Sequence, residues 1–394
     1  MSSVERTVAD PADAALAADA INDFGLELLR RATPGGENAV LSPASIVLAL
    51  AMARTGARGE TASEIDQVFR NVASDEHASW LNALDSALAT RSGTFKDRAN
   101  EDAEVLLRIA NQSFAQGDFP WEPDYLDALA ARFGSGLRLV DFIRDAEGAR
   151  LDVNAWVAER TEGRIPELLP QGSVDAMTRL VLVNAIYLKA AWLSPFDEKV
   201  TRSGSFHRLD GSSIDVPMMH GTFGARYAEG DGWQAVELPY VGRQLAMMVV
   251  LPDELPAFEA ALDGASLEKI AAALEDERIA LSFPRFGIES KLTLNDVLGA
   301  MGMPLAFDPD RADFSGITPV DDLYISGVIH QANIDVDEEG TEAAAATAVV
   351  MGIVSMPPEP IPLAVDRPFL FALRDVETGA ILFLGRVVEP VERN

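Results

Sequence analysis

Residues 338–351 read EEGTEAAAATAVVM, and this stretch decides how the rest of the chain is interpreted. In an extended strand, alternate side chains point to opposite faces. One face then holds only uncharged residues: Thr341, Ala343, Ala345, Thr347, Val349 and Met351. Glu342, the only charge after Gly340, falls on the other face. Because the side chains from 343 to 350 are no larger than valine, we expect this segment to enter a packed sheet without burying a charge.

The same stretch is compatible with other local structures. Ala343–Ala346 is a good helix former, so a surface helix or a small-residue loop fits as well. A segment whose local preference leaves helix, strand and loop open is a candidate for a conformational switch. Prolines follow it, and they lack the amide donor that a central strand needs. They stand at positions 357, 358, 360 and 362.

Composition places the chain among globular proteins of the soluble kind, with 48% hydrophobic and 24% charged residues. The chain has 394 residues, with no long linker and no repeat of 20–50 residues. We therefore expect an N-terminal tail over residues 1–11 and a single domain over residues 12–394.

The net charge is −30, from 62 acidic and 32 basic residues. This charge excludes the phosphate neutralisation that nucleic-acid binding needs, and it disfavours anionic membranes. The acidic residues are spread along the whole chain, which favours a solvated coat over a binding patch for a basic partner.

The chain contains no cysteine, which excludes disulfides, thiol catalysis and thiolate metal sites. The N-terminus lacks the basic start and apolar run of a signal peptide, and no apolar stretch reaches the ~18 residues that span a bilayer. The sequence thus predicts a cytoplasmic location, with an extracellular location as the alternative.

Helical patterns are concentrated in the first half of the chain. Ala12–Arg31 has a stripe of apolar residues: Leu16, Ile21, Phe24 and Leu28. Ser42 and Pro43 are typical of an N-cap and a first turn, and the apolar run Ile46–Met52 predicts that the following helix is buried. Thr61 and Glu64 form a capping-box pattern for a helix that ends near Arg70. Further helices are expected over Leu151–Arg160 and near residues 254–275 and 293–301.

Strand patterns dominate the second half, without regular alternation with helices, so the fold class predicted is α+β. Leu180–Leu188 (LVLVNAIYL) is almost wholly apolar and fits a strand that is covered on both faces. Other predicted strands are Val105–Phe114, Ala235–Leu238, Leu245–Leu251, Ile279–Phe286 and Leu323–His330. A C-terminal hairpin is predicted from Phe369–Leu373 and Ile381–Val388, around a turn with Thr378 and Gly379.

No motif supports an enzyme. The four histidines form no metal pattern, and no nucleophile elbow, P-loop or dinucleotide fingerprint is present, so we expect no catalytic residue, cofactor or metal. Polar residues in apolar surroundings require a different explanation, because buried polar groups usually pair with one another. We expect four of them to form one hydrogen-bonded cluster between helix and sheet, namely Ser42, Ser45, Asn184 and His330.

Four segments together resemble an inhibitory, prokaryote-like member of the serpin family of serine protease inhibitors, over about Ala14–Pro390. Ser42–Ile46 (SPASI) resembles the start of its buried helix, and Asn184–Trp192 (NAIYLKAAW) its central strand. EEGTEAAAATA resembles its reactive-loop hinge, and Val365–Pro390 its C-terminal signature. Leu188 and Ala190 stand where phenylalanine and glycine are more usual, and we expect packing differences there.

The resemblance implies a fold of three β-sheets and eight or nine helices, with an exposed reactive-centre loop over about residues 338–362. A target protease cleaves the loop and forms an acyl-enzyme, and the cut loop inserts into the central sheet and traps the protease. The resemblance also implies that the polar cluster lies where the sheet opens, and that the loop first inserts at Trp192. The hinge lacks charged, proline or bulky residues on its inward face, which favours an inhibitor over a non-inhibitory binding protein or protease substrate.

Family spacing, counted from Gly340, places the scissile bond between Val354 and Ser355, with Ile353 or Met356 as alternatives and Met351 as a more distant one. Valine there would suit an elastase-like or subtilisin-like protease, because no arginine or lysine lies between residues 340 and 362. No basic helix face of the heparin-binding kind is visible. The partners expected are therefore a serine protease in covalent complex, with no heparin, nucleic acid or membrane, and the protein is expected to be a monomer.

Overall fold

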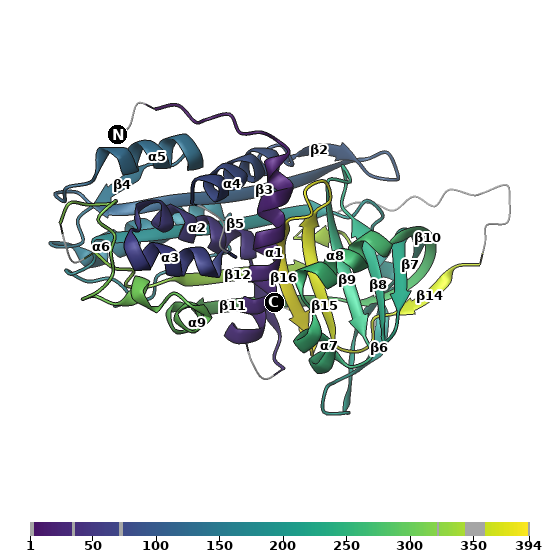
Figure 1. The fold of residues 1–394 in the computed structure, drawn as a ribbon. Coiled ribbons are helices and arrows are strands. Elements are labelled where there is room, and N and C mark those ends of the chain that lie inside the picture. Colours follow the sequence, from purple (N-terminus) through teal and green to yellow (C-terminus); the bar gives the residue numbers. More distant parts are fainter. Residues whose placement is uncertain (1–3, 34–35, 71–73, 321–322, 343–358, 393–394) are drawn as a thin grey trace.

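The computed structural model describes residues 4–33, 36–70, 74–320, 323–342 and 359–392, and gives the backbone alone for residues 74, 75, 110 and 184. Within these residues it contains nine α-helices and sixteen strands (Figure 1). The helices are α1 (Asp13–Ala32), α2 (Pro43–Gly56), α3 (Gly59–Val68), α4 (Ser74–Leu88), α5 (Pro123–Phe133), α6 (Ala146–Arg160), α7 (Leu255–Ala261), α8 (Gly264–Ala273) and α9 (Asn295–Met301).

The strands form two hydrogen-bonded sheets. The seven-stranded sheet contains β2 (Gly93–Lys96), β3 (Asp102–Gln116), β4 (Leu137–Val140), β5 (Leu180–Ala191), β11 (Phe286–Thr293), β12 (Ile329–Val336) and β13 (Gly340–Thr341). The nine-stranded sheet contains β1 (Ala39–Leu41), β6 (Arg202–His207), β7 (Ser213–Gly230), β8 (Trp233–Pro239), β9 (Leu245–Pro252), β10 (Glu275–Pro284), β14 (Ile361–Ala364), β15 (Phe369–Asp375) and β16 (Ile381–Val387). Two short 3₁₀ helices cover Glu198–Val200 and Pro304–Phe307.

The nine-stranded sheet has two portions that share the long strand β7. Its first six residues pair with β6 and its middle with β10, while its last five residues pair with β8. One portion is then β6–β7–β10–β14, and the other runs from β8 through β9, β15 and β16 to β1. Together with the seven-stranded sheet these portions give the three sheets that were expected, and the mainly antiparallel pairing confirms the α+β class.

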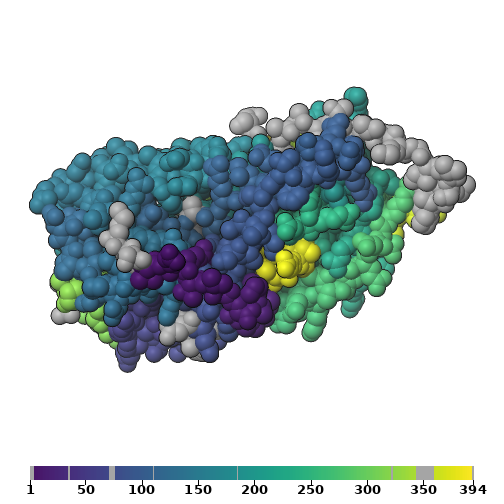
Figure 2. Space-filling model, turned by 90° about the horizontal axis from the view of Figure 1, so that it is seen from above, coloured from purple at the N-terminus to yellow at the C-terminus, as the bar shows by residue number. Residues whose placement is uncertain are grey.

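Helices surround the seven-stranded sheet at one end of the molecule, whereas α7 and α8 accompany the other sheet (Figure 1). Seen from above, blue residues of the N-terminal half fill one end, and green residues of β7–β10 and α8 lie towards the other (Figure 2). Strand β5 is buried on both faces, as predicted. Val183 and Ala185 join the cluster beneath α6, and Ile186 and Leu188 face the main core.

Helix α2 begins as its sequence predicts. Ser42 is the N-cap, its side chain accepts a hydrogen bond from the Ser45 amide, and Pro43 occupies the first turn. This capping satisfies one of the amides that a helix start leaves without partners. The helix is apolar on nearly every side, so it lies in the core rather than at the surface.

Several local predictions were wrong. Thr61 and Glu64 do not cap α3, because their oxygens accept tertiary hydrogen bonds from the amides of Asp313 and Leu305. Leu16 is 45% exposed, although the rest of its stripe is buried.

Two strand predictions were also wrong in extent. The chain passes from one sheet to the other at Arg285, so Ile279–Phe286 is divided between β10 and β11. Leu323–Val328 forms no strand, because its backbone bonds go to residues 294 and 306. Only the end of that prediction, at His330, lies in β12.

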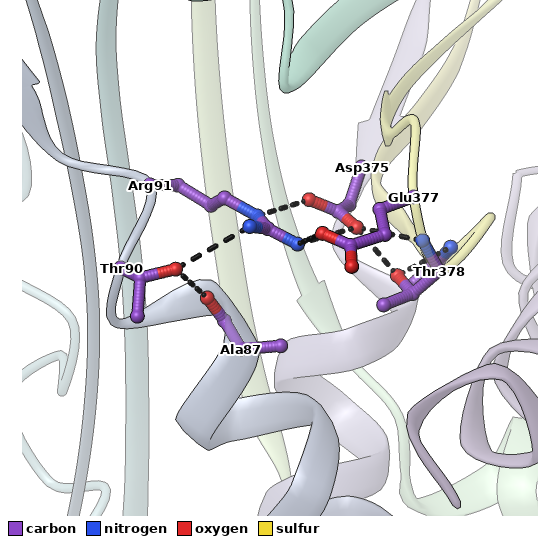
Figure 3. Close-up of polar contacts among 7 residues, drawn as sticks. Ala87, Thr90, Arg91, Asp375, Glu377 and Thr378 are labelled. Carbon is purple, nitrogen blue, oxygen red and sulfur yellow. Dashed lines mark hydrogen bonds and ion pairs between the residues drawn. The ribbon is translucent and has the colours of Figure 1, made fainter. Parts of the chain in front are cut away.

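A buried ion pair fastens the C-terminal hairpin to the end of α4 (Figure 3). Arg91 Nε lies 2.6 Å from Asp375 Oδ2, and these side chains are 4% and 0% exposed. The Asp375 carboxylate also accepts hydrogen bonds from the amide and hydroxyl of Thr378 in the hairpin turn. Glu377 is a second, largely exposed partner of Arg91. A charge pair buried this completely is retained only when its remaining hydrogen-bonding groups are satisfied, as they are here.

Candidate functional site: the hinge and its slot

The first hinge residues already form a strand inside the seven-stranded sheet. Gly340 and Thr341 pair with Ala191 and Ala190 of β5, and Thr341 also pairs with Val336 of β12. Among the described residues, no ladder joins β5 directly to β12. The hinge therefore occupies the top of a slot between two strands, and this part of the expected exposed loop is instead buried.

Glycine is required at position 340 because the strands approach closely there. A Cβ atom added to Gly340 would lie 2.1 Å from the carbonyl oxygen of Ala190 and 2.9 Å from Cα of Ala191. Both are backbone atoms of the neighbouring strand and cannot rotate away. The hinge can occupy its place only without a side chain at this position.

Thr341 points into the core, as strand parity predicted, and is 2% exposed. Its hydroxyl lies 2.6 Å from the hydroxyl of Tyr240. Burial raises the pKa of Tyr240, so this hydroxyl stays protonated. The ring of Tyr240 stacks on Trp192, with centroids 4.5 Å apart and an interplanar angle of 8°.

Trp192 is more than a core aromatic residue. Its indole Nε1–H donates to the carbonyl oxygen of Asp337, and its amide donates to that of Glu339. Asp337 in turn accepts the amides of Glu339 and Gly340 through Oδ1. Trp192 thus lies at the turn by which the chain leaves β12 and enters the slot.

Glu338 anchors this turn with a buried carboxylate. It is 2% exposed, and its Oε1 lies 2.6 Å from Arg285 Nη2. The Thr201 hydroxyl donates to the same oxygen. The ion pair with Glu338 raises the pKa of Arg285. A carboxylate with a cation and a hydroxyl donor is a stable buried arrangement, because its charge is paired.

Glu342 corrects the expectation that the segment buries no charge. Its carboxylate is 3% exposed and lies 3.3 Å from Arg164 Nε. Glu342 lies on the opposite face from Thr341, as predicted, but this face is covered by α6 and the residues that follow it. Its φ of +53° is left-handed, a conformation that is costly for a residue with a side chain.

Two of the four residues of the predicted polar cluster, Ser42 and His330, are joined between helix and sheet, whereas the buried hydroxyl of Ser45 has no hydrogen-bond partner among the described residues. The Ser42 amide donates to His330 Nε2 at 3.0 Å, and Ser42 Oγ accepts from the Ser45 amide at 3.3 Å. Because Nε2 accepts, the neutral ring carries its proton on Nδ1. Burial lowers the pKa of His330 to about 4, so the ring is neutral at pH 7. The side chain of the fourth residue, Asn184, lies outside the part of the chain that the structure describes.

The remaining predicted site residues fall outside the described part of the chain. They are Ala343, Ala345, Thr347, Val354 and Ser355, with the alternatives Met351, Ile353 and Met356. Beyond them, residues 361–362 of the expected loop already belong to β14. Pro362 is tolerated there because β14 lies at the edge of its sheet, where β10 is its one partner among the described strands.

Sequence reasoning missed three residues of the site. Tyr240, Arg285 and Arg164 contact the hinge from positions 53–178 residues away in sequence. A buried tyrosine usually needs a hydrogen-bond partner, but no local pattern indicates which one.

Neither a metal-binding cluster nor a membrane-spanning helix is found among the described residues. No three side chains among their His, Asp and Glu residues gather closely enough to hold a metal ion. None of their helices combines the length and apolar character of a membrane span.

Comparison with known proteins defines the class. Residues 19–390 match the family model described as serpin (serine protease inhibitor). An uncharacterized serpin-like protein of Thermococcus kodakarensis is 38% identical over 376 residues, covering 94% of this chain and 85% of that protein. The human leukocyte elastase inhibitor is 35% identical over 381 residues, which cover 93% of this chain and 97% of that protein.

Solved structures agree. The thermophilic serpin tengpin in its native state has a TM-score of 0.82 at 26% identity, covering 98% of this chain and 96% of its own. A cleaved structure of serpin 42Da has a TM-score of 0.83 at 32% identity, and the match covers 97% of this chain and 100% of that structure's chain. The chain belongs to the serpin family, whose members are described as serine protease inhibitors.

Proposed function

We propose that this chain is a suicide-substrate inhibitor of serine proteases, in which cleavage at Val354–Ser355 releases the loop to insert between β5 and β12. The observation that carries this proposal is the position of Gly340 and Thr341, which are already paired with β5 at the top of the slot.

The existing register indicates how far insertion would proceed. Because Thr341 pairs with Ala190 in an antiparallel ladder, each further loop residue would pair one position earlier in β5. Ten steps bring Met351 opposite Leu180, the first residue of β5. Val354 then lies just beyond the end of the strand, which supports the bond assigned from family spacing.

The face of the loop also fits this register. Residues directly opposite one another share a face of the sheet, and Thr341 shares one with Ala190, Leu188 and Ile186. The same parity sends Ala343, Ala345 and Thr347 towards the main core. About a dozen new ladder bonds at ~0.5–1.5 kcal/mol each would yield on the order of 10 kcal/mol. The uncleaved form would then be metastable and held by a kinetic barrier.

The protease class follows from the valine at position 354. A small apolar primary pocket, as in elastase-like or subtilisin-like enzymes, accepts valine, whereas a trypsin-like pocket needs arginine or lysine. The similarity to a protein named leukocyte elastase inhibitor supports an elastase-like target.

The test is to mix the protein with an elastase and to separate the products on a denaturing gel. A complex that survives boiling is expected, and mass spectrometry of the released C-terminal peptide should give a fragment that begins at Ser355. Loop cleavage without complex, and without a rise in melting temperature, would instead show a non-inhibitory substrate.

Arginine substitution tests the position of the scissile bond. Val354→Arg should redirect complex formation to trypsin. Ile353→Arg and Met356→Arg are matched controls, and they should be cleaved by trypsin with less or no complex. Complex with one of the controls instead would move the bond to that position.

A further inference from the structure

The residues that follow α6 cross the slot which the loop would have to fill. We call residues 161–169 the strap. Ile165, Leu168 and Leu169 of the strap pack beneath α6 in the cluster that covers β3 and β5. The strap therefore lies on the face of the sheet opposite the main core, where Glu342 points.

Polar contacts tie the strap to strands on both sides of the slot. On the β5 side, Glu162 Oε1 lies 2.5 Å from Arg108 of β3. On the β12 side, the Asn333 side-chain amide donates to the Arg164 carbonyl oxygen at 2.9 Å. Lys291 of β11 donates to the Glu167 carbonyl oxygen at 2.8 Å. Widening the slot would have to stretch or break one of these sets of contacts.

Arg164 connects the strap to the hinge itself. Its guanidinium makes two ion pairs, from Nε to Glu342 at 3.3 Å and from Nη1 to Asp335 of β12 at 3.5 Å. Glu342 is also hydrogen-bonded to the side chain of Tyr187 of β5, and its amide donates to the Asp335 carbonyl oxygen. The hinge carboxylate is thus held from the strap, from β5 and from β12.

This arrangement holds Glu342 out of the strand conformation. Continuing the ladder would place Glu342 opposite Lys189 of β5, with an extended backbone. At φ +53° the chain instead leaves the strand conformation at Glu342 itself, although the Glu342 amide still bonds to the carbonyl oxygen of Asp335 in β12. Insertion cannot advance by one residue until this residue changes conformation and its carboxylate moves relative to Arg164.

We propose that Arg164 is a positioning residue which, with Glu342 and Tyr187, forms a latch that arrests the hinge after Thr341 and slows the insertion of the rest of the loop. The latch would control the rate of the loop insertion on which the proposed inhibition depends, so its role in the cell rests on the proposed function. Its physical content, an obstacle to strand insertion, is independent of any protease.

The experiment therefore measures insertion without a protease. The full chain is incubated at a temperature below its melting point, and insertion of its own uncleaved loop is followed on native gels and by the accompanying rise in melting temperature. Arg164→Ala and Glu342→Gln should each insert their own loop about five- to tenfold faster, the range expected when a partly exposed ion pair of about 1 kcal/mol is lost. Arg144→Ala, which removes an arginine whose ion pairs are fully at the surface, is the matched control and should match the parent.

Further variants separate a latch from a general loss of stability. The double variant should insert no faster than Arg164→Ala alone, because both changes remove the same contact. Arg164→Lys should restore only part of the delay, since an ammonium group cannot serve both carboxylates through a rigid fork. Glu342→Gly should accelerate insertion as well, despite the better fit of glycine to a positive φ.

Insertion rates within twofold of the parent, or additive effects in the double variant, would overturn the latch. If the single variants change insertion as expected while the parent forms no complex with elastase, the latch stands and the proposed inhibitory function fails. If the parent forms a complex with elastase but the variants insert at the parental rate, the proposed inhibitory function stands and the latch fails.

Discussion

The hydroxyl of Tyr240 lies 2.6 Å from the hydroxyl of Thr341, and both groups are buried. This contact links the first inserted hinge residue to the segment that follows β8, and through the stacked ring of Trp192 to the end of β5. The hinge is thus held by a specific bond in the core as well as by the sheet ladder.

The first prediction concerns this bond. Tyr240→Phe leaves the Thr341 hydroxyl buried without its partner, and we expect the free energy of unfolding in urea to fall by about 1–3 kcal/mol. Thr341→Val should have a similar effect by leaving the tyrosine hydroxyl unpaired. Combining both changes should cost much less than their sum, because no unpaired polar group remains. Strictly additive losses would show that the two hydroxyls are not coupled.

The second prediction concerns Gly340. Gly340→Ala would place a methyl group against the backbone of β5, so we expect the hinge to withdraw from the slot at a cost of about 1–3 kcal/mol. The Trp192 amide, which donates to Glu339, should then exchange its hydrogen faster. Gly327→Ala is the control, because an added Cβ there meets no atom within 4 Å. If the Trp192 amide exchanges its hydrogen at the same rate in Gly340→Ala and Gly327→Ala, the close approach of the strands at Gly340 is contradicted.

Local signals in the sequence predicted the parts of the fold that depend on neighbouring residues. Ser42 and Pro43 identified the start of α2 because capping involves only adjacent groups. Strand parity placed Thr341 inward for the same reason. The capping-box pattern of Thr61 and Glu64 was misleading because both side chains serve distant backbone amides.

The contacts of the site itself could not be predicted in this way. Tyr240 is 101 residues from Thr341, and Arg285 is 53 residues from Glu338. The order of the strands in the sheets brings these distant residues together, and no short-range pattern in the sequence predicts that order. The buried charge of Glu342 was missed because parity identifies a face but not what covers that face.

The third prediction tests the buried ion pair of Figure 3. Arg91→Ala leaves the carboxylate of Asp375, which is fully buried, without its cation, and should lower the free energy of unfolding by about 3–5 kcal/mol. Glu377→Ala removes the second carboxylate partner of Arg91. Because the Glu377 side chain is 75% exposed, we expect this change to lower the free energy of unfolding by less than about 1 kcal/mol. Similar losses in the two variants, measured by urea unfolding, would show that burial does not decide the strength of this contact.

The fourth prediction is a pH dependence. Burial lowers the pKa of both His330 and His77 to about 4, from about 6.5 for a free histidine. Between these values the unfolded chain binds protons that the folded chain does not, so the free energy of unfolding should fall as the pH drops from 6.5 to 4. Each histidine would contribute on the order of 3 kcal/mol across this window.

His330→Gln isolates one of the two contributions. The glutamine oxygen can still accept the Ser42 amide, while the side chain no longer titrates. We expect the loss of stability between pH 6.5 and pH 4 to shrink without vanishing, because His77 and His220, whose pKa values burial also lowers, still titrate in this variant. Carboxyl groups such as Asp19 and Asp337, whose pKa burial raises, act with the opposite sign, but they are common to all variants and cancel in the comparison. A His330→Gln protein whose stability falls with pH as steeply as that of the parent would show that His330 is not the neutral, buried acceptor of the Ser42 amide.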